Sequence, residues 1–222
     1  MLEALTHRAF FTFELPIHRL EKPPKIDGTL RGWKQRYQLP RLHDIDADAR
    51  EEQLATVYAG WHPTGLYIAF EHTEWLGQPD CDPVNWWKGD GYRICIDTRD
   101  ARDIRRATRF CHFFYAMPAG GGRNRSEPVV KLHTMTRAKE SPPPIDDSQI
   151  ERAVHIERNY LAMEIGIPAA CLHGWDPIEH ARIGFFYKAK LARRGGQTLT
   201  VGDEMGWNVD PSTWATAVLT GE

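Results

Sequence analysis

Residues 84–100 constrain the fold of this chain more than any other stretch. Their sequence, VNWWKGDGYRICIDTRD, places two tryptophans before a Gly-Asp-Gly turn and then alternates strictly. Successive residues of 92–97 point to opposite sides of an extended chain, which is the period-two pattern of a half-buried β-strand. Glycine adopts a positive φ at little cost, so the turn can lead an aromatic loop directly into that strand. We therefore predict a central strand that Trp86 and Trp87 flank where it enters the sheet.

Short alternating segments of the same kind recur along the chain. They lie at 10–20, 54–61, 65–75, 108–117, 128–137, 154–156, 160–167, 182–191 and 213–219. Turn residues separate them and helical periodicity is almost absent, which indicates an all-β, jelly-roll-like sandwich of two antiparallel sheets with at most short helical turns. The length of 222 residues suits one such sandwich, so we expect a single domain over 1–222. Pro16 interrupts the first segment and favours an edge position for it.

The charge balance excludes two classes of partner. The chain carries 28 basic and 30 acidic residues, a net charge of −2, so we expect neither nucleic acid nor an anionic membrane as a partner. No apolar run reaches the roughly 18 residues of a membrane span, and the first residues lack the pattern of an export signal. We expect a soluble chain without an export signal. The compartment stays open, with an extracellular or periplasmic location as the alternative for a trimmed sequence, and so does the oligomeric state.

Cysteines and acidic residues give no clear metal or catalytic signature. Cys81, Cys95, Cys111 and Cys171 lack zinc-like spacing. Cys95 and Cys111 fall on consecutive predicted strands, so a disulfide stays open beside the commoner outcome of free buried thiols. The acidic segment 43–52 could hold calcium but lacks the pattern of a calcium loop. No hydrolase or metalloprotease motif occurs, and no spacing singles out two carboxylates as acid and base. We expect no enzymatic activity and no cofactor, with calcium as the alternative.

Four stretches, in order over about 190 residues, together resemble a known family. They are IDG at 26–28 followed by Trp33, GLYIA at 65–69, WKGD at 87–90 leading to ID at 96–97, and GWNVDP at 206–211 followed by TAVL at 216–219. Between the last two lies EIGIP at 164–168. The set resembles the family 9 carbohydrate-binding modules and the wider DOMON-like jelly-roll group.

The resemblance implies a ligand site as well as a fold. In the sugar-binding members, the tryptophan of the W-x-x-D motif and one near the C-terminus hold a terminal sugar ring between them, and these positions fall on Trp87 and Trp207. An indole that covers the C–H face of a pyranose gains about 25 cal/mol per Å² of apolar surface removed from water, enough for weak binding. The resemblance therefore implies non-catalytic binding of a carbohydrate or polyol through an aromatic clamp.

The polar residues depart from the family pattern. Arg93 stands where the family usually carries an acidic residue, and its guanidinium could reach adjacent hydroxyls or the carboxylate of a uronic acid. His112 and Tyr115, on the following strand, are the further candidates for ligand binding. Asp90 is better suited to fixing the turn by accepting hydrogen bonds from backbone N–H groups.

An alternative function remains from the residues alone. Aromatic side chains dominate protein cores, so Trp87 and Trp207 could be core residues of a DOMON-like structural or protein-interaction domain that has lost the sugar site, with Arg93 in an ion pair. The exposure of the two rings separates these hypotheses. Some DOMON-like relatives bind haem through methionine with histidine or lysine, but no spacing selects such a set here, so haem is not expected.

Overall fold

The computed structural model describes residues 13–40 and 53–221, and this part of the chain is built from strands. The strands are β1 (Glu14–Arg19), β2 (Thr56–His62), β3 (Gly65–His72), β4 (Gly91–Asp97), β5 (Cys111–Gly121), β6 (Glu127–His133), β7 (Glu151–Glu157), β8 (Tyr160–Pro168), β9 (Arg182–Leu191), β10 (Gly195–Thr198) and β11 (Ala215–Thr220). Helical structure in the described residues is limited to three-residue 3-10 turns, among them η5 (Asp203–Met205) and η6 (Pro211–Thr213).

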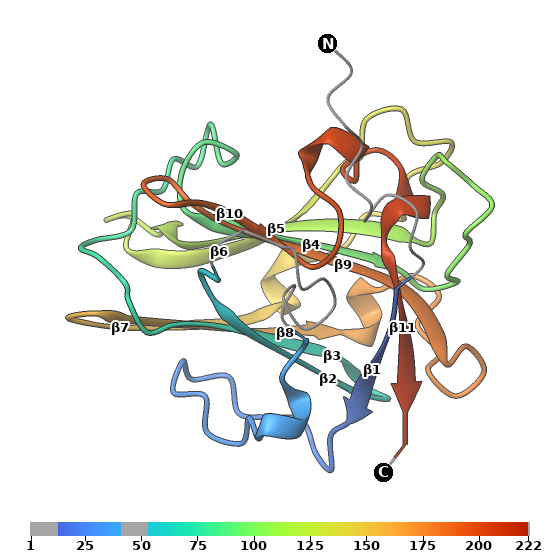
Figure 1. Ribbon diagram of the computed structural model, residues 1–222, viewed down its shortest axis with the longest axis horizontal. Coiled ribbons are helices and arrows are strands. Elements are labelled where there is room, and N and C mark those ends of the chain that lie inside the picture. Colours follow the sequence, from blue (N-terminus) through green and yellow to red (C-terminus); the bar gives the residue numbers. More distant parts are fainter. Residues whose placement is uncertain (1–12, 41–52, 222) are drawn as a thin grey trace.

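The strands form two layers that are continuous along one side. Hydrogen bonding runs in the order β6-β5-β4-β9-β11-β1-β2-β3-β8-β7, and β10 pairs with β9. Figure 1 shows β4, β5, β6, β9 and β10 in one layer, β2, β3, β7 and β8 in the other, and β1 and β11 joining them. The predicted all-β sandwich with only short helical turns is confirmed.

The first strand does not lie at an edge, as Pro16 had suggested. Strand β1 pairs in parallel with β11 and with β2, and these are exceptions to the otherwise antiparallel order. The N–H of Thr216 bonds to the carbonyl of Phe13, so alternate residues from 13 onward face β11 and Pro16 faces β2. Pairing with β2 begins only at His18. The missing N–H of Pro16 therefore costs no hydrogen bond to β2.

Alternation on β3 and β4 builds the core between the layers. Leu66, Ile68 and Phe70 of β3 are fully buried, as are Ile94 and Ile96 of β4. The rings of Phe70 and Tyr92 stack across the layers with centroids 3.9 Å apart. Since Tyr92 points into the core, Arg93 must point to the opposite, outer face of β4.

Several smaller features complete the comparison with the sequence. Strand β5 extends beyond the predicted segment 108–117 to Gly121 through a register shift, and β10 is a strand that the sequence did not predict. All four cysteines lie among the described residues and are free thiols.

The candidate calcium segment 43–52 lies outside the described residues. Among the residues that the structure describes, no group of three or more His, Cys, Asp or Glu side chains could hold a metal ion. None of the described helices is long and apolar enough to cross a membrane.

Candidate functional site

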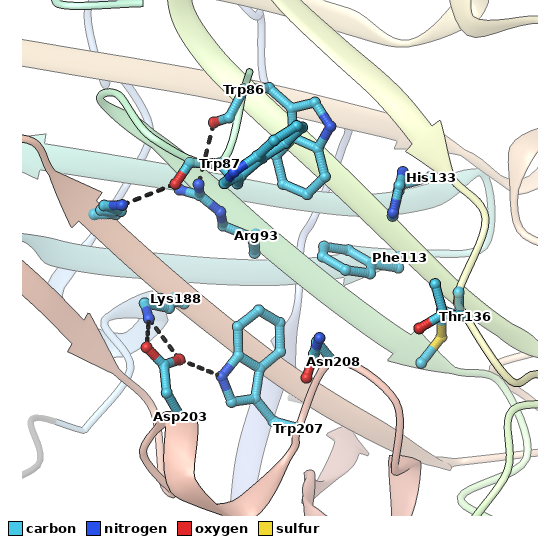
Figure 2. Close-up of a pocket in the computed structure, with 12 residues that line it drawn as sticks. Trp86, Trp87, Arg93, Phe113, His133, Thr136, Lys188, Asp203, Trp207 and Asn208 are labelled. Carbon is cyan, nitrogen blue, oxygen red and sulfur yellow. Dashed lines mark hydrogen bonds and ion pairs between the residues drawn. The ribbon is translucent and has the colours of Figure 1, made fainter. Parts of the chain in front are cut away.

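A cavity of about 560 Å³ lies on the outer face of the layer that contains β4. Its floor comes from neighbouring strands: Arg93 of β4, Phe113 of β5, His133 of β6, and Lys188 and Lys190 of β9. Figure 2 shows Trp86 and Trp87 on one side of this floor, Trp207 on the opposite side, and Arg93 between them. The cavity therefore has two aromatic walls and a charged floor.

The first wall is the loop that precedes β4. Trp86 stacks on Tyr115 with ring centroids 4.6 Å apart, and Trp87 meets Trp86 edge to face. The Trp87 side chain is 50% exposed, so one large apolar surface faces solvent at the rim of the cavity. Asp90 holds the loop, because its carboxylate accepts hydrogen bonds from the N–H groups of Asp80 at 2.7 Å and Ala192 at 2.8 Å.

The second wall is the segment between β10 and β11. Trp207 lies on Phe186 with centroids 4.8 Å apart, and its indole N–H donates to Asp203 Oδ1 at 2.8 Å. Lys188 Nζ donates to both carboxylate oxygens of Asp203. Trp207 is only 6% exposed. The clamp that the resemblance implies needs a face of this ring open to a ligand. The structure instead packs Trp207 on Phe186, because β9 directs the Phe186 ring outward beneath the loop.

Arg93 connects the floor to the first wall. Its guanidinium donates to the carbonyl oxygens of Gly91 at 3.2 Å and Trp86 at 3.1 Å, and Cζ lies 5.3 Å from the centre of the Trp86 ring. The side chain is 4% exposed. Burial lowers the pKa of Arg93 to about 10, so the group still carries its charge at neutral pH.

Of the two candidates on β5, neither lines the cavity. His112 is fully buried on the core side of the strand, where its Nε2 accepts a hydrogen bond from the N–H of His173 at 2.9 Å. Strand alternation puts Phe113 and Tyr115 on the cavity side and His112 on the other, so His112 cannot reach a ligand in the cavity. Tyr115 lies on the correct side but behind Trp86, which it supports.

The structure adds residues that the sequence analysis did not name as candidates for ligand binding. Trp86, Lys188, Lys190 and Asp203 all line the cavity. Lys188 and Lys190 follow Phe186 at every second position of the strand predicted at 182–191, so strand alternation could have placed the two lysines on one face. Asp203 offered no such signal, because it lies in the 3-10 turn η5, outside any strand.

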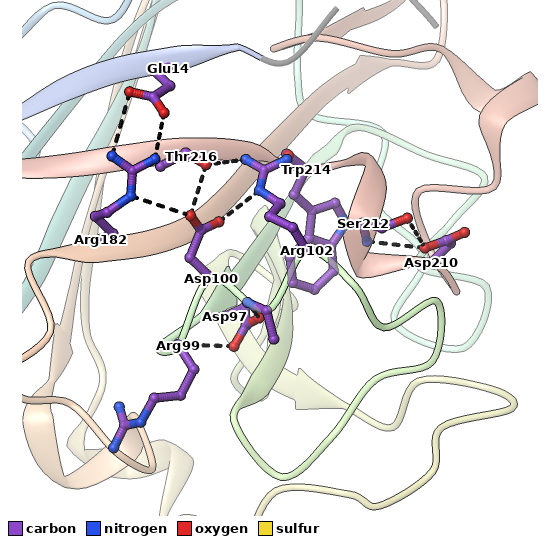
Figure 3. Close-up of polar contacts among 11 residues, drawn as sticks. Glu14, Asp97, Arg99, Asp100, Arg102, Arg182, Asp210, Ser212, Trp214 and Thr216 are labelled. Carbon is purple, nitrogen blue, oxygen red and sulfur yellow. Dashed lines mark hydrogen bonds and ion pairs between the residues drawn. The ribbon is translucent and has the colours of Figure 1, made fainter. Parts of the chain in front are cut away.

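A polar network holds the second wall in place (Figure 3). Asp100 accepts a hydrogen bond from Arg102 Nε at 2.9 Å, and Arg102 donates to the carbonyl of Trp214 and the hydroxyl of Thr216. The Trp214 indole N–H in turn donates to the carbonyl of Trp207 at 2.8 Å. The residues that follow β4 thus fix the backbone that carries the Trp207 ring.

The carboxyl groups at the cavity bear on the ordinary mechanism of glycoside hydrolysis. Asp203 is the single carboxylate among the described residues that line it, and Lys188 and Trp207 already bond to it. Glycoside hydrolysis ordinarily uses two carboxyl groups across the scissile bond. Within the described residues, therefore, the cavity lacks that pair.

Comparison with known proteins gives a relationship of fold. No family model and no curated protein matches the chain. A family 9 carbohydrate-binding module from Caldicellulosiruptor kristjanssonii, solved in complex with cellotriose, superposes with a TM-score of 0.63 at 14% identity, covering 94% of this chain and 94% of that one. The same kind of module solved with glucose gives 0.63 at 14% identity, covering 94% and 96% of the two chains. A protein from Bacteroides uniformis gives 0.55 at 8% identity, covering 95% and 100%. The resemblance to family 9 that the four motifs predicted is confirmed at the level of the fold.

Proposed function

We propose that this chain binds a saccharide without altering it chemically, in the cavity between Trp87 and Trp207. The observation that carries the proposal is the cavity itself: about 560 Å³, with aromatic walls on two sides and cationic donors on its floor. The apolar faces of a sugar ring suit indole walls, and the polar floor suits its hydroxyls. The two modules of the same fold that were solved with cellotriose and glucose support this choice of ligand class.

The two tryptophans would contribute in different ways. Trp87 is half-exposed and would lose water-exposed apolar surface when a ring stacks on it. Trp207 is already packed on Phe186, so only the part of its ring at the cavity could meet a ligand. Arg93, between them, would donate to ligand oxygens from the floor. His112 has no part in this proposal, and Tyr115 acts only by supporting Trp86.

A glycan array followed by titration with the best sugars, monitored by tryptophan fluorescence, tests the proposal. We expect micromolar to millimolar dissociation constants, and a loss of about 1–3 kcal/mol of binding free energy for Trp87→Ala. Ile178→Ala is the matched control, because Ile178 is an exposed apolar residue that does not line the cavity. Chromatography of each bound sugar after long incubation should show it unchanged. An array without any response, or cleavage of a bound sugar, would contradict the proposal.

A structural or protein-interaction domain is the second candidate, and the burial of Trp207 favours it. A ring that is 6% exposed and stacked on Phe186 contributes to packing whether or not a ligand binds. This alternative expects no sugar response in the parent protein and no functional role for the exposed Trp87.

A further inference from the structure

Positive charge exceeds negative charge in the cavity. Three cationic side chains, Arg93, Lys188 and Lys190, line it together with one carboxylate, Asp203, which leaves a net charge of +2. Burial lowers the pKa of His133, so this residue is neutral at pH 7 and does not change the balance. Lys188 and Asp203 form an ion pair through Nζ–O contacts of 2.6 and 2.5 Å, so the excess resides on Arg93 and Lys190.

These two cations have no carboxylate partner among the described residues. Arg93 donates to the carbonyl oxygens of Gly91 and Trp86, and Lys190 Nζ donates to that of Trp87 at 2.8 Å. Carbonyl groups are dipoles and leave the positive charge in place. The pKa of Lys190 is lowered by burial first and then by the charges of Arg93 and Lys188. Two partly desolvated positive charges thus face one cavity, and among the described lining residues only Asp203, which already pairs with Lys188, offsets them. An anion would relieve this arrangement.

The hydrogen-bonding groups of the cavity also fit an anion better than a wholly neutral sugar. Each sugar hydroxyl donates as well as accepts, so a neutral sugar needs acceptors around it. The Asp203 oxygens already accept from Lys188 and Trp207. Among the described lining residues, the side-chain oxygens of Asn208 and Thr136 and one ring nitrogen of the neutral His133 remain as neutral acceptors, whereas the cations supply donors in excess.

We propose that the saccharide taken by this cavity carries a carboxylate, as a uronic acid does, and that Arg93 and Lys190 bind this group. This inference rests on the saccharide binding proposed above. A carboxylate only accepts hydrogen bonds when ionised, and the planar fork of an arginine matches its two oxygens. Arg93 uses two of its five N–H groups on backbone carbonyls, which leaves three for a ligand.

Calorimetric titration with matched pairs of sugars tests the inference. The pairs are glucose with glucuronate, galactose with galacturonate, and mannose with mannuronate, and glucose 6-phosphate is added as a non-carboxylate anion. For the pair that binds, we expect the uronate to bind at least about tenfold more tightly, the effect of one charge-assisted hydrogen bond. The preference should shrink as salt rises from about 0.05 M to about 0.5 M.

Two variants locate the effect. Lys190→Gln and Arg93→Gln should each reduce the preference for the uronate toward that for its neutral partner. Lys190 is the safer test, since its side chain is partly exposed while Arg93 supports the Trp86 loop. Lys22→Gln, an exposed lysine outside the cavity with the same change of charge, is the control and should leave the preference unchanged.

The outcomes separate this inference from the proposed function. Equal binding of a neutral sugar and its uronate would overturn the carboxylate and leave saccharide binding in place. Tighter binding of glucose 6-phosphate than of glucuronate would also overturn it, because charge alone would then be recognised. A preference that survives Lys190→Gln and Arg93→Gln would overturn the assignment of these two residues. Absence of binding by every sugar in the panel and on the glycan array would contradict saccharide binding itself.

Discussion

The Trp207 indole lies nearly parallel to the Phe186 ring, with an interplanar angle of 22° and centroids 4.8 Å apart. This contact makes Trp207 part of the packed structure, although the residue lies in a turn and also borders the cavity. Trp87, which the sequence treated as its equivalent, is 50% exposed. The two tryptophans should therefore respond differently to mutation.

Replacing the two tryptophans by alanine should separate stability from binding. Trp207→Ala leaves a cavity above Phe186 and removes the hydrogen bond to Asp203, so we expect a loss of about 3–5 kcal/mol in the free energy of unfolding. Trp87→Ala removes an exposed ring and should cost less than about 1 kcal/mol. Urea denaturation measures both. Trp207→Phe, which keeps an aromatic ring, should recover part of the loss, and equal destabilisation by the two alanine variants would contradict the assigned burial.

Arg102 should hold the backbone of the second wall in place, although it does not line the cavity. Its guanidinium bonds to Asp100, to the Trp214 carbonyl and to Thr216, so Arg102→Gln frees the backbone that positions Trp207. We expect faster amide hydrogen exchange in 203–214 and a loss of about 1–3 kcal/mol of stability. Arg123→Gln, an exposed arginine in another loop, is the control. Unchanged exchange in 203–214 would contradict the role of the network.

Glu164 should be required for stability rather than for ligand binding. This fully buried carboxylate accepts hydrogen bonds from the N–H groups of Asp27 at 3.0 Å and Gly28 at 2.5 Å and from the Trp33 indole at 2.8 Å. Glu164→Gln replaces an accepting oxygen with a donor, and we expect a loss of about 2–3 kcal/mol in denaturation experiments. Glu151→Gln, an exposed glutamate on the adjacent strand, should stay within about 0.5 kcal/mol of the parent. Sugar affinity should not change in either variant.

Two buried histidines should make the protein less stable in acid. Burial lowers the pKa of both His72 and His112 to about 4. In the unfolded chain these groups would titrate near pH 6.5, so unfolding takes up protons between about pH 6.5 and about pH 4. The free energy of unfolding should be level above this window and fall within it by about 1.4 kcal/mol per pH unit for each histidine.

Urea denaturation at a series of pH values measures that slope. His72 Nδ1 lies 2.6 Å from the Leu54 carbonyl oxygen and Nε2 lies 2.8 Å from the Tyr92 hydroxyl, so His72→Gln keeps polar atoms in the site while removing the titration. The variant should show a shallower slope than the parent, whereas His180→Gln, outside the core, serves as the control. A parent protein equally stable at about pH 7 and about pH 5 would rule out the neutral buried state.

The turn at 26–28 illustrates what motif reading can and cannot reach. Gly28 has a φ of +82°, and a Cβ there would lie 2.8 Å from the Val154 carbonyl carbon, so the glycine of this motif is required by backbone geometry and close packing. Its partner Glu164 is 136 residues away in the sequence, within another motif of the same resemblance. Nothing local to either segment indicated that one carboxylate would join them.

By itself, the sequence determined the strand-rich architecture, because a period of two and the turn residues are local properties that each segment carries along the chain. It determined the central place of 92–97, the outward direction of Arg93 and the family resemblance of the fold. Only the tertiary structure decided which candidates meet. In it, His112 lies on the core side and Tyr115 lies behind Trp86. The residues that join the cavity are Lys188, Lys190 and Asp203. The physical reason is that side-chain exposure and electrostatic balance depend on strand pairing and loop packing between distant segments. Trp87 and Trp207 look alike in the sequence, and the packing of Trp207 on Phe186 together with its hydrogen bond to Asp203 makes them different.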